Sequence, residues 1–469
     1  MMLVVLWTDA LVFLLVAVAI GFGVYASRHA HLRAPWREVA RSRIGMATLV
    51  ILGGYALIGL LDTVHFRLPL SDAPAGTSHQ YAPQVLSLFD VWAAPLRERQ
   101  EKTYSAPFAT HLFVKEAITQ PDGRVLRDYP RLQYGGRHLS DPDRRGGDIL
   151  LTSLRGLVEG LVGWGLIALS IVWLLARRNG DSVSAVLVRV RSGRTELPLI
   201  PSGRTALGTL ALMLVLGCIA GELALKYHIL GTDKVGEDVF YQALKSIRTG
   251  LVIGTLTTLV MLPAAVLLGI MAGYFRGWVD DGIQYLYTTL NAIPGVLLIA
   301  AAILMLQVYM ANHADRFESL VERADLRLLF LCLILGVTSW TGLCRLLRGE
   351  VLKLREADYV QAGSALGVGH FAILGRHILP NVLHIVMITL VLDFSGLVLA
   401  EAVLSYVNIG VDPTMNSWGS MINSARLELA REPVVWWSLA AAFLFMFTLV
   451  LAANLFADVV RDAFDPRVR

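Results

Sequence analysis

The fold of this chain is decided by one stretch, Arg355-Glu356-Ala357-Asp358-Tyr359-Val360-Gln361-Ala362-Gly363-Ser364-Ala365-Leu366-Gly367, which lies between two long hydrophobic runs. Leu354, Ala357, Gln361 and Ala365 recur at steps of three and four residues, which predicts a helix as far as residue 366. Gly367 favours a helix end, because only glycine takes the left-handed conformation without steric cost. A second short helix is expected over residues 369–376, before a proline that fits the first turn of the next helix. The stretch therefore predicts a helix-turn-helix between two membrane spans.

The composition places the chain among membrane proteins. Of its 469 residues, 55% are hydrophobic and 17% are charged, and the mean hydropathy is +0.59, whereas soluble proteins carry about 25% charged residues. Several apolar runs exceed about 18 residues, the length that lets a helix cross a bilayer. The small net charge of +4 gives no sign of a nucleic-acid partner. Cys218, Cys332 and Cys344 lie in or beside apolar runs and form no disulfide or metal pattern. We therefore expect an all-α polytopic membrane protein that contacts lipid.

Basic residues set the expected orientation, because short loops rich in Arg and Lys stay in the cytoplasm. Residues 28–43 hold five arginines and one acid, and residues 177–204 hold six arginines and two acids. The first apolar run, residues 11–25, has no basic residue before it, so we expect a retained span rather than a signal peptide. Alternation then puts the N-terminus outside and the C-terminus in the cytoplasm. The expected spans are 6–26, 44–61, 150–176, 205–225, 248–274, 283–310, 327–347, 381–405 and 434–457.

The opening stretch resembles the cytoplasmic coupling loop of bacterial ABC importer permeases, in their dipeptide and oligopeptide branch. That family's pattern is Glu-Ala-Ala, three residues, Gly, and then about a dozen residues to Leu-Pro. Gly367, Leu379 and Pro380 keep this spacing, whereas Gln361 and Gly363 depart from it. The resemblance implies that the loop docks in a groove on a separate ATPase subunit. The residues implied to couple the two are Glu356, Ala357, Tyr359, Gln361, Ala362, Gly363, Gly367, Leu379 and Pro380.

Further motifs occur in the family's order. Leu230-Gly231-Thr232-Asp233, with Gly236 and Asp238, is similar to the family's exported gate motif, and Glu237 replaces the usual arginine. The other matching motifs are Ala272-Gly273-Tyr274 with Gly277-Trp278-Val279-Asp280, Ala292-Ile293-Pro294-Gly295, Arg348-Gly349-Glu350, Ser417-Trp418-Gly419 and Arg461-Asp462-Ala463-Phe464-Asp465-Pro466-Arg467. Together they imply a six-helix type I importer permease core.

Four parts are expected along the chain. Two N-terminal membrane helices occupy 1–61, and a long exported (periplasmic) segment follows at 62–148. A third extra membrane helix and a basic cytoplasmic linker occupy 149–204, and the permease core, with its coupling loop at 348–380, occupies 205–469. The extra helices brace the complex or dock a binding protein, and the sequence leaves both roles open.

The sequence lacks the motifs of an enzyme that would power transport by itself. It contains no Gly-x-x-x-x-Gly-Lys-Ser/Thr, His-Glu-x-x-His or Gly-x-Ser-x-Gly stretch. We therefore expect no catalytic residue, no metal site and no cofactor bound by this chain. The resemblance implies that ATP and Mg are bound by two separate ABC ATPase subunits. It also implies a second homologous permease, forming a heterodimer, and a periplasmic or lipid-anchored substrate-binding protein.

Charged residues within predicted spans are functional candidates, because each is costly in hydrocarbon. Glu222, Asp393 and Glu401 are the three candidates for the transport pathway. Asp393 and Glu401 lie eight residues apart, so they fall on a similar helix face. One interpretation is that this face lines the pathway and meets a peptide's amino terminus. The other is that Glu401 lies near the outer end of its span and that Asp393 pairs with a neighbouring subunit.

A weak internal repeat relates residues 138–161 to residues 228–251. Seven identities recur ninety residues apart: His138/His228, Asp143/Asp233, Gly146/Gly236, Asp148/Asp238, Leu154/Leu244, Gly160/Gly250 and Leu161/Leu251. A partial duplication explains them, and so does a polar turn followed by an apolar helix. A duplication predicts that the third span packs at the periphery, as the first core span does.

These observations predict a permease subunit of an ATP-driven importer of dipeptides or oligopeptides in the bacterial inner membrane. Two alternatives stay open. One is the same fold with another cargo, such as nickel, a glycosylated compound or an antimicrobial peptide. The other is a membrane scaffold without transport, in which the altered Gln361-Ala362-Gly363 no longer couples to an ATPase.

Overall fold

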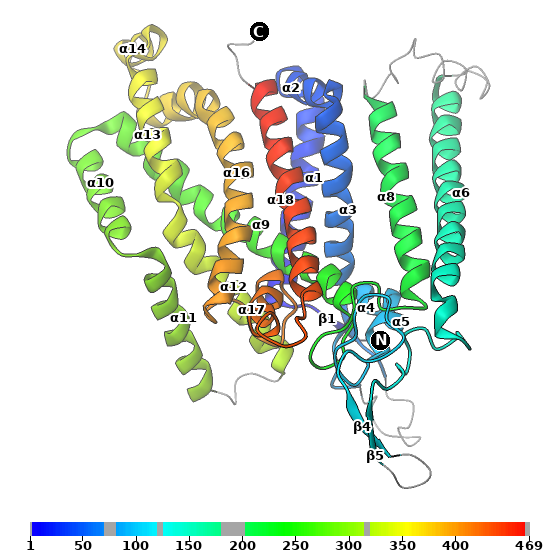
Figure 1. Ribbon diagram of the computed structural model, residues 1–469. Helices are drawn as coiled ribbons and strands as arrows, with labels where there is room; N and C mark the ends of the chain where they lie inside the picture. The colour runs from blue at the N-terminus through cyan, green and yellow to red at the C-terminus, as the bar shows by residue number, and fades with distance from the viewer. Residues whose placement is uncertain (1, 70–80, 120–124, 180–201, 314–318, 465–469) are drawn as a thin grey trace, which may run out of the picture. The chain divides into compact units, whose positions relative to one another are not determined.

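A computed structural model of the chain describes residues 2–69, 81–119, 125–179, 202–313 and 319–464 (Figure 1). Within these residues, nine helices are long and apolar enough to cross a membrane. The all-α polytopic class is confirmed, and strands are limited to short pieces such as β1 (Met2–Val4). Most of the predicted basic linker and the motif Asp465-Pro466-Arg467 lie outside the described residues. The chain divides into two compact units.

The first unit contains residues 36–248 and 416–452, together with the first two residues. It holds three whole membrane helices, the start of α9 and most of α18, with α6 packed along α8 and α8 along α3 (Figure 1). The predicted exported segment connects α3 to α6 and forms short strands and helices. The helices are α3 (Arg43–Thr63), α4 (Leu88–Trp92), α5 (Ala94–Glu98), α6 (Arg145–Asn179), α8 (Gly203–Ala224), α9 (Val239–Phe275), α17 (Trp418–Glu428) and α18 (Trp437–Phe464). The strands are β2 (His65–Arg67) antiparallel to β3 (Leu86–Ser87), and β4 (Glu116–Thr119) antiparallel to β5 (Val125–Asp128).

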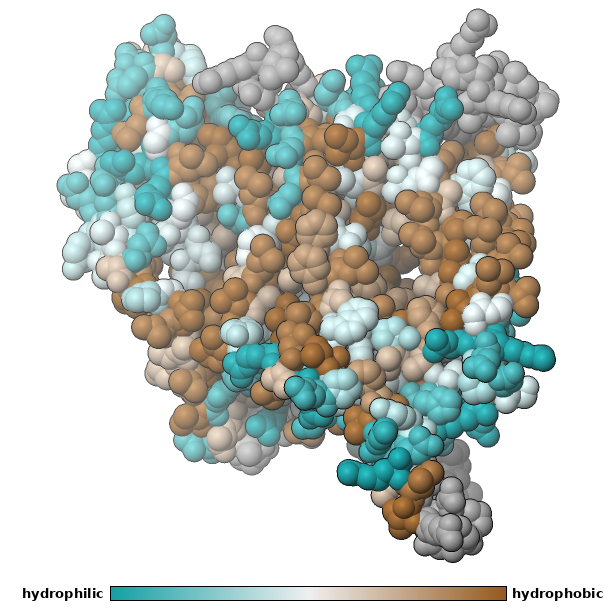
Figure 2. All heavy atoms as spheres, in the orientation of Figure 1, coloured by the Kyte–Doolittle hydropathy of each residue, from teal (hydrophilic) through white to brown (hydrophobic). Residues whose placement is uncertain are grey.

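Helices α6 and α8 approach each other at backbone distance. A methyl group added to Gly156 would lie 2.7 Å from the Cα of Ile219, and one added to Gly160 would lie 2.7 Å from the Cα of Val215. Membrane helices use small residues for such close packing, because lipid provides no hydrophobic force between them. The other faces of α6 and α8 are apolar and exposed, as the brown surface in Figure 2 shows over these helices.

The second unit contains residues 3–35, 249–415 and 453–469. One buried cluster joins α9 to α10, α13 and α16, and a second joins α9 to α11 and α12. The N-terminal helix α1 packs on α12, where Asp325 accepts hydrogen bonds from the backbone amide and the hydroxyl of Thr8. The helices are α1 (Trp7–Arg28), α10 (Gly277–Ala292), α11 (Gly295–Asn312), α12 (Leu320–Ser339), α13 (Thr341–Arg355) and α16 (Leu379–Tyr406), while α2 (Ala30–Arg41) crosses the boundary between the units.

The predicted sixth span, 283–310, is wrong as a single helix. It is divided between α10 and α11 at Ile293, which has an extended backbone with φ −88° and ψ 128°. The next residue is Pro294, and the proline ring clashes with a helical backbone at the residue before it. Pro294 therefore ends one helix and begins another.

The packing of α6 on α8 gives a matched pair of substitutions. Replacing Gly160 by Leu should lower the free energy of unfolding of the purified protein by about 1–3 kcal/mol, because the new side chain would clash with the backbone of α8. The melting temperature should fall accordingly. Gly163→Leu is the control, since no atom lies within 4 Å of a methyl group placed there. Thermal unfolding in detergent measures both, and equal melting temperatures for the two variants would contradict the packing.

Candidate functional site

The predicted coupling loop folds as a helix-turn-helix. Helix α14 (Asp358–Ala365) is followed by Gly367 at φ +75°, then by α15 (His370–Ile373) and a π-helical turn (Leu374–Ile378). The first helix begins at Asp358 rather than at 355, because Ala357 is extended with ψ 140°. Leu379 and Pro380 form the first turn of α16, as the sequence predicted. The loop therefore leaves and re-enters the membrane helices through fixed turns.

The base of the loop is anchored on the turn between α9 and α10. Val360, Ile373 and Ile378 are at most 2% exposed and belong to the buried cluster of α9, α13 and α16.

Polar contacts also join the loop to the end of α9 and the turn that follows it. Arg355 donates to the backbone carbonyl of Tyr274 (2.9 Å), the Tyr274 hydroxyl meets Nδ1 of His370 (2.9 Å), and Arg276 pairs with Glu356 (2.6 Å).

An ion pair fixes the helix that leads into the loop. Arg348 on α13 donates two hydrogen bonds, each 2.6 Å long, to the carboxylate of Asp280 on α10. Two parallel hydrogen bonds between an arginine and a carboxylate fix the orientation of both side chains as well as attracting them to each other. The hydrogen bonds from Arg348 hold the pKa of Asp280 below its ordinary value. Both residues belong to motifs of the family, although the sequence did not indicate that they meet.

The tip of the loop is exposed. Glu356, Tyr359, Gln361, Ala362 and Gly367 are all exposed, while Ala357 and Gly363 are half-buried. Two residues that the sequence analysis missed stand out on either side of Gly367: Leu366 is 83% exposed and Phe371 is 86% exposed. Their size and apolar character are visible in the sequence, but the loop holds other apolar residues, so their exposure could not be predicted. Exposed apolar side chains are common on protein-binding surfaces, so the tip is a candidate for one.

A cleft of about 500 Å³ opens beside the tip. Its walls come from the end of α9, the end of α13, and helices α14 and α15, and they carry both charged and apolar side chains. The lining residues are Tyr274, Phe275, Arg355, Glu356, Val360, Gln361, Ser364, Ala365 and His370. The cleft can therefore receive a side chain from a protein that binds the tip.

The second candidate site is the loop of the exported gate motif, before α9. Gly231, Thr232, Gly236 and Asp238 are buried, and Asp233 is half-buried. Gly236 has φ +81°, and a methyl group there would overlap the backbone carbonyl of Glu101 in the exported segment. Only glycine both adopts this left-handed backbone without strain and leaves room for the neighbouring carbonyl.

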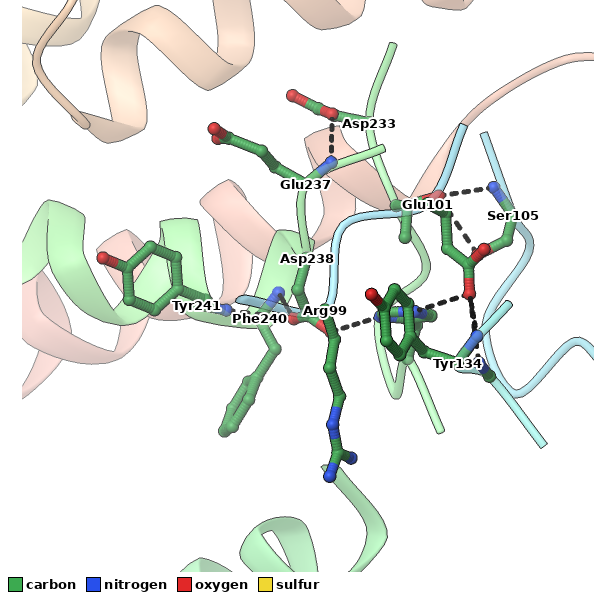
Figure 3. A network of polar contacts seen from close by, with 12 residues as sticks. Arg99, Glu101, Ser105, Tyr134, Asp233, Glu237, Asp238, Phe240 and Tyr241 are labelled. Atoms are coloured by element: carbon green, nitrogen blue, oxygen red, sulfur yellow. Dashed lines mark hydrogen bonds and ion pairs between the residues drawn. The ribbon is translucent and has the colours of Figure 1, made fainter. Parts of the chain in front are cut away.

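A buried chain of polar contacts joins the exported segment to this loop (Figure 3). Glu101 accepts hydrogen bonds from the backbone amides of residues 133–135, over 2.8–3.1 Å. Its carboxylate lies 3.5 Å from Nε2 of His228, whose Nδ1 lies 2.7 Å from Asp238. Asp238 in turn accepts hydrogen bonds from the amides of Phe240 (2.9 Å) and Tyr241 (3.1 Å), so it caps α9.

The charges in this chain of contacts stabilise one another. Burial by itself lowers the pKa of His228, but the hydrogen bond to Asp238 and the nearby Glu101 carboxylate outweigh it and raise the pKa to about 9. Burial raises the pKa of Glu101, yet His228 and the three amides hold it below its ordinary value. The histidine is therefore a cation between two carboxylates at neutral pH. Glu101 and His228 were missed as site residues, because no local pattern marks a lone Glu in a long polar segment.

The three pathway candidates lie in different surroundings. Glu222 on α8 pairs with Arg155 of α6 at 3.4 Å, which accounts for its charge within a membrane helix. Glu401 is 3% exposed and accepts a hydrogen bond from Ser405 at 2.6 Å. Asp393 is half-buried near the middle of α16, and none of the described residues forms an ion pair with it. No group of three or more His, Cys, Asp or Glu in the described ranges is placed to hold a metal ion.

The suspected repeat shares one contact and differs in backbone. His138 meets Asp148 at 2.8 Å, just as His228 meets Asp238 ten residues on. Gly146, however, lies within α6, whereas its counterpart Gly236 has a left-handed backbone. A duplication therefore stays a hypothesis.

The raised pKa of His228 predicts a pH dependence of stability. The stabilisation is complete below 6.5, the ordinary pKa of histidine, and is lost as the pH rises through about 9. We expect the wild type to lose roughly 2–3 kcal/mol more than His228→Gln between pH 7 and pH 10. Thermal unfolding at several pH values measures this difference, with His138→Gln as the control. Parallel curves for the wild type and His228→Gln would contradict it.

Comparison with known proteins finds similar membrane transport proteins. Residues 265–469 match the family model described as "Binding-protein-dependent transport system inner membrane component". The chain is 32% identical over 244 residues to the glutathione transport system permease protein GsiD of Pectobacterium atrosepticum, a match that covers 52% of this chain and 73% of that protein. It is 30% identical over 242 residues to the oligopeptide transport system permease protein OppC of Mycobacterium bovis, covering 52% and 77% of the two chains. It is 28% identical over 242 residues to the dipeptide transport system permease protein DppC of Bacillus subtilis, covering 52% and 69%.

The helix-turn-helix lies within residues 265–469, the range that the family model matches. Nine helices among the described residues are long and apolar enough to cross a membrane. The chain therefore belongs to the family of binding-protein-dependent transport system inner membrane components.

Proposed function

We propose that this chain is a permease subunit of an ATP-driven importer that carries peptides across the inner membrane. The single observation that carries the proposal is the coupling loop, whose base is fixed by buried contacts while Leu366 and Phe371 at its tip are exposed. Such a tip transmits force only if it is held rigidly at one end and bound at the other. The names of the similar permeases, for glutathione, dipeptides and oligopeptides, support a peptide cargo.

The proposed assembly contains four kinds of subunit. Two ATPases bind the tips of the coupling loops, a second permease completes the membrane pathway, and an exported binding protein delivers the peptide. ATP and Mg are bound by the ATPases, so this chain is a transport subunit and not an enzyme. Closure of the ATPases moves α14 and, with it, the adjoining helix α13. The ion pair between Arg348 on α13 and Asp280 on α10 then carries the movement to α10. The pathway then opens to alternate faces.

The proposed orientation follows from the basic loops. The coupling loop, with Arg345, Arg348, Lys353, Arg355 and Arg376 in and beside it, lies in the cytoplasm. Counting spans from there places the N-terminus and residues 62–148 outside and the C-terminus inside.

Asp393 is the proposed pathway carboxylate, because it is half-buried near the middle of a membrane helix. Glu222 and Glu401 have partners that account for them, so neither is needed as a pathway charge.

An Asp393→Asn variant should take up tri-alanine several-fold more slowly, because the positive amino terminus loses its counter-charge in the membrane. Uptake of N-acetylated tri-alanine, which lacks that positive charge, should change little. Asp281→Asn, an exposed carboxylate on α10, serves as the control. Equal loss with both peptides, or no loss with either, would exclude the role.

The coupling role is tested at Gly367. A Gly367→Ala variant should assemble normally but transport about tenfold more slowly, because an L side chain at positive φ costs about 1–2 kcal/mol and distorts the tip. The complex is purified through a tag on this chain, and its ATPase activity and peptide uptake in proteoliposomes are measured together. Gly369→Ala is the matched control, since Gly369 has φ −63° and no neighbour within 4 Å.

Two results would overturn the proposal. If no ATPase purifies with the wild-type chain, the protein is a scaffold rather than a transport subunit. If Gly367→Ala transports as fast as Gly369→Ala, the loop does not couple ATP hydrolysis to uptake.

A further inference from the structure

The exported segment covers the loop of the exported gate motif. Thr232 is fully buried, Asp238 is 2% exposed and His228 is 4% exposed. Their cover is residues 101–108, which form backbone hydrogen bonds from Glu101 to Gly236 (2.9 Å), from Thr232 to Ser105 (3.0 Å) and from Phe108 to His228 (3.0 Å). The Thr232 hydroxyl also donates to the backbone carbonyl of Thr103 at 2.9 Å. The exported segment therefore packs against the loop through these hydrogen bonds and does not form a separate subdomain.

The first tie between this segment and α9 is the buried carboxylate of Glu101. It holds the backbone of residues 133–135 on one side and His228 on the other. His228 fixes Asp238, which caps the first turn of α9 (Figure 3). The segment is therefore connected to the start of α9 by the Glu101–His228 ion pair and by the charged hydrogen bond between His228 and Asp238.

The second tie lies two turns further along α9. Lys245 donates to Asp90 of α4 and lies 3.8 Å from Asp62 of α3. The Tyr241 hydroxyl donates to the same Asp90 at 2.6 Å, and Ser87 donates to Asp62 at 2.6 Å. A lysine within a membrane helix is costly without such partners. Both of its carboxylates come from the part of the chain that precedes the core.

We propose that Glu101 is a positioning residue for transport, through which the exported segment moves the outer end of α9 when the binding protein touches that segment. The proposal rests on the proposed importer function and extends it to the N-terminal part of the chain. The binding protein is the partner because the family depends on one, and because the segment covers the loop that the binding protein would otherwise touch. Glu101 acts through His228 and contacts no substrate.

Glu101→Gln is the test, because it keeps the shape of the side chain and removes the charge that faces His228. The purified complex should retain its yield and its basal ATPase activity. Stimulation of ATPase activity by the binding protein should fall roughly tenfold, because the variant loses the buried ion pair with His228 and weakens the charged hydrogen bonds of residue 101 to the amides of residues 133–135. Glu101→Asp, which keeps the charge, should recover part of the stimulation.

Two controls separate positioning from general damage. Glu116→Gln removes a carboxylate of the same segment, whose partner Lys102 is 72% exposed. His138→Gln removes the matching histidine–aspartate pair at the start of α6, which does not cap α9. Both variants should respond to the binding protein as the wild type does.

A double-mutant cycle completes the test. Glu101→Gln and His228→Gln together should be no worse than His228→Gln alone, because the two residues act in one chain of contacts. Additive losses, or a loss of stimulation that only follows the yield of complex, would overturn the proposal. If the wild-type complex lacks ATPase activity altogether, the proposed function fails instead. If the wild type transports and Glu101→Gln matches it, only the positioning role fails.

Discussion

Several charged side chains beside or within the membrane segments are held in ion pairs, and each of these pairs joins one helix to another. Arg155 and Glu222 join α6 to α8, Lys245 joins α9 to Asp62 and Asp90, and Arg348 joins α13 to Asp280. Each pair removes the cost of a lone charge in a medium of low dielectric constant. Apolar packing alone is weakly directional in lipid, so these pairs and the close glycine contacts specify the neighbours of each helix.

The coupling loop combines a rigid base with an open tip. Val360, Ile373 and Ile378 bury the base against membrane helices, and Arg276 and Arg355 tie it to the turn after α9. The tip carries the exposed apolar side chains and the family's motif. A departure such as Gly363 for alanine lies on α14, where a methyl group would find no neighbour within 4 Å. Gly363 in place of alanine therefore neither opens nor removes a packing contact within this chain.

Much of the fold was predictable from sequence, because it depends on local signals. Apolar length gave the membrane helices, and Gly367 and Pro380 gave the ends of the helices in the coupling loop. The sixth span was predicted as one helix that continues through Pro294, because a proline bends some membrane helices and ends others. Glu101 and His228 lie more than a hundred positions apart, so their contact leaves no periodic trace in the sequence. The same holds for Arg348 and Asp280, whose motifs were recognised although their contact was not.

The buried contacts of the exported segment also bear on how this permease could be shortened. A chain cut back to residue 205 would keep every motif of the family. It would nevertheless bring Thr232 and Asp238 into contact with water and leave Lys245 in its membrane helix without either counter-ion. The smallest working version of this transporter is therefore set by what surrounds the outer end of α9, and not by where the recognisable domain starts.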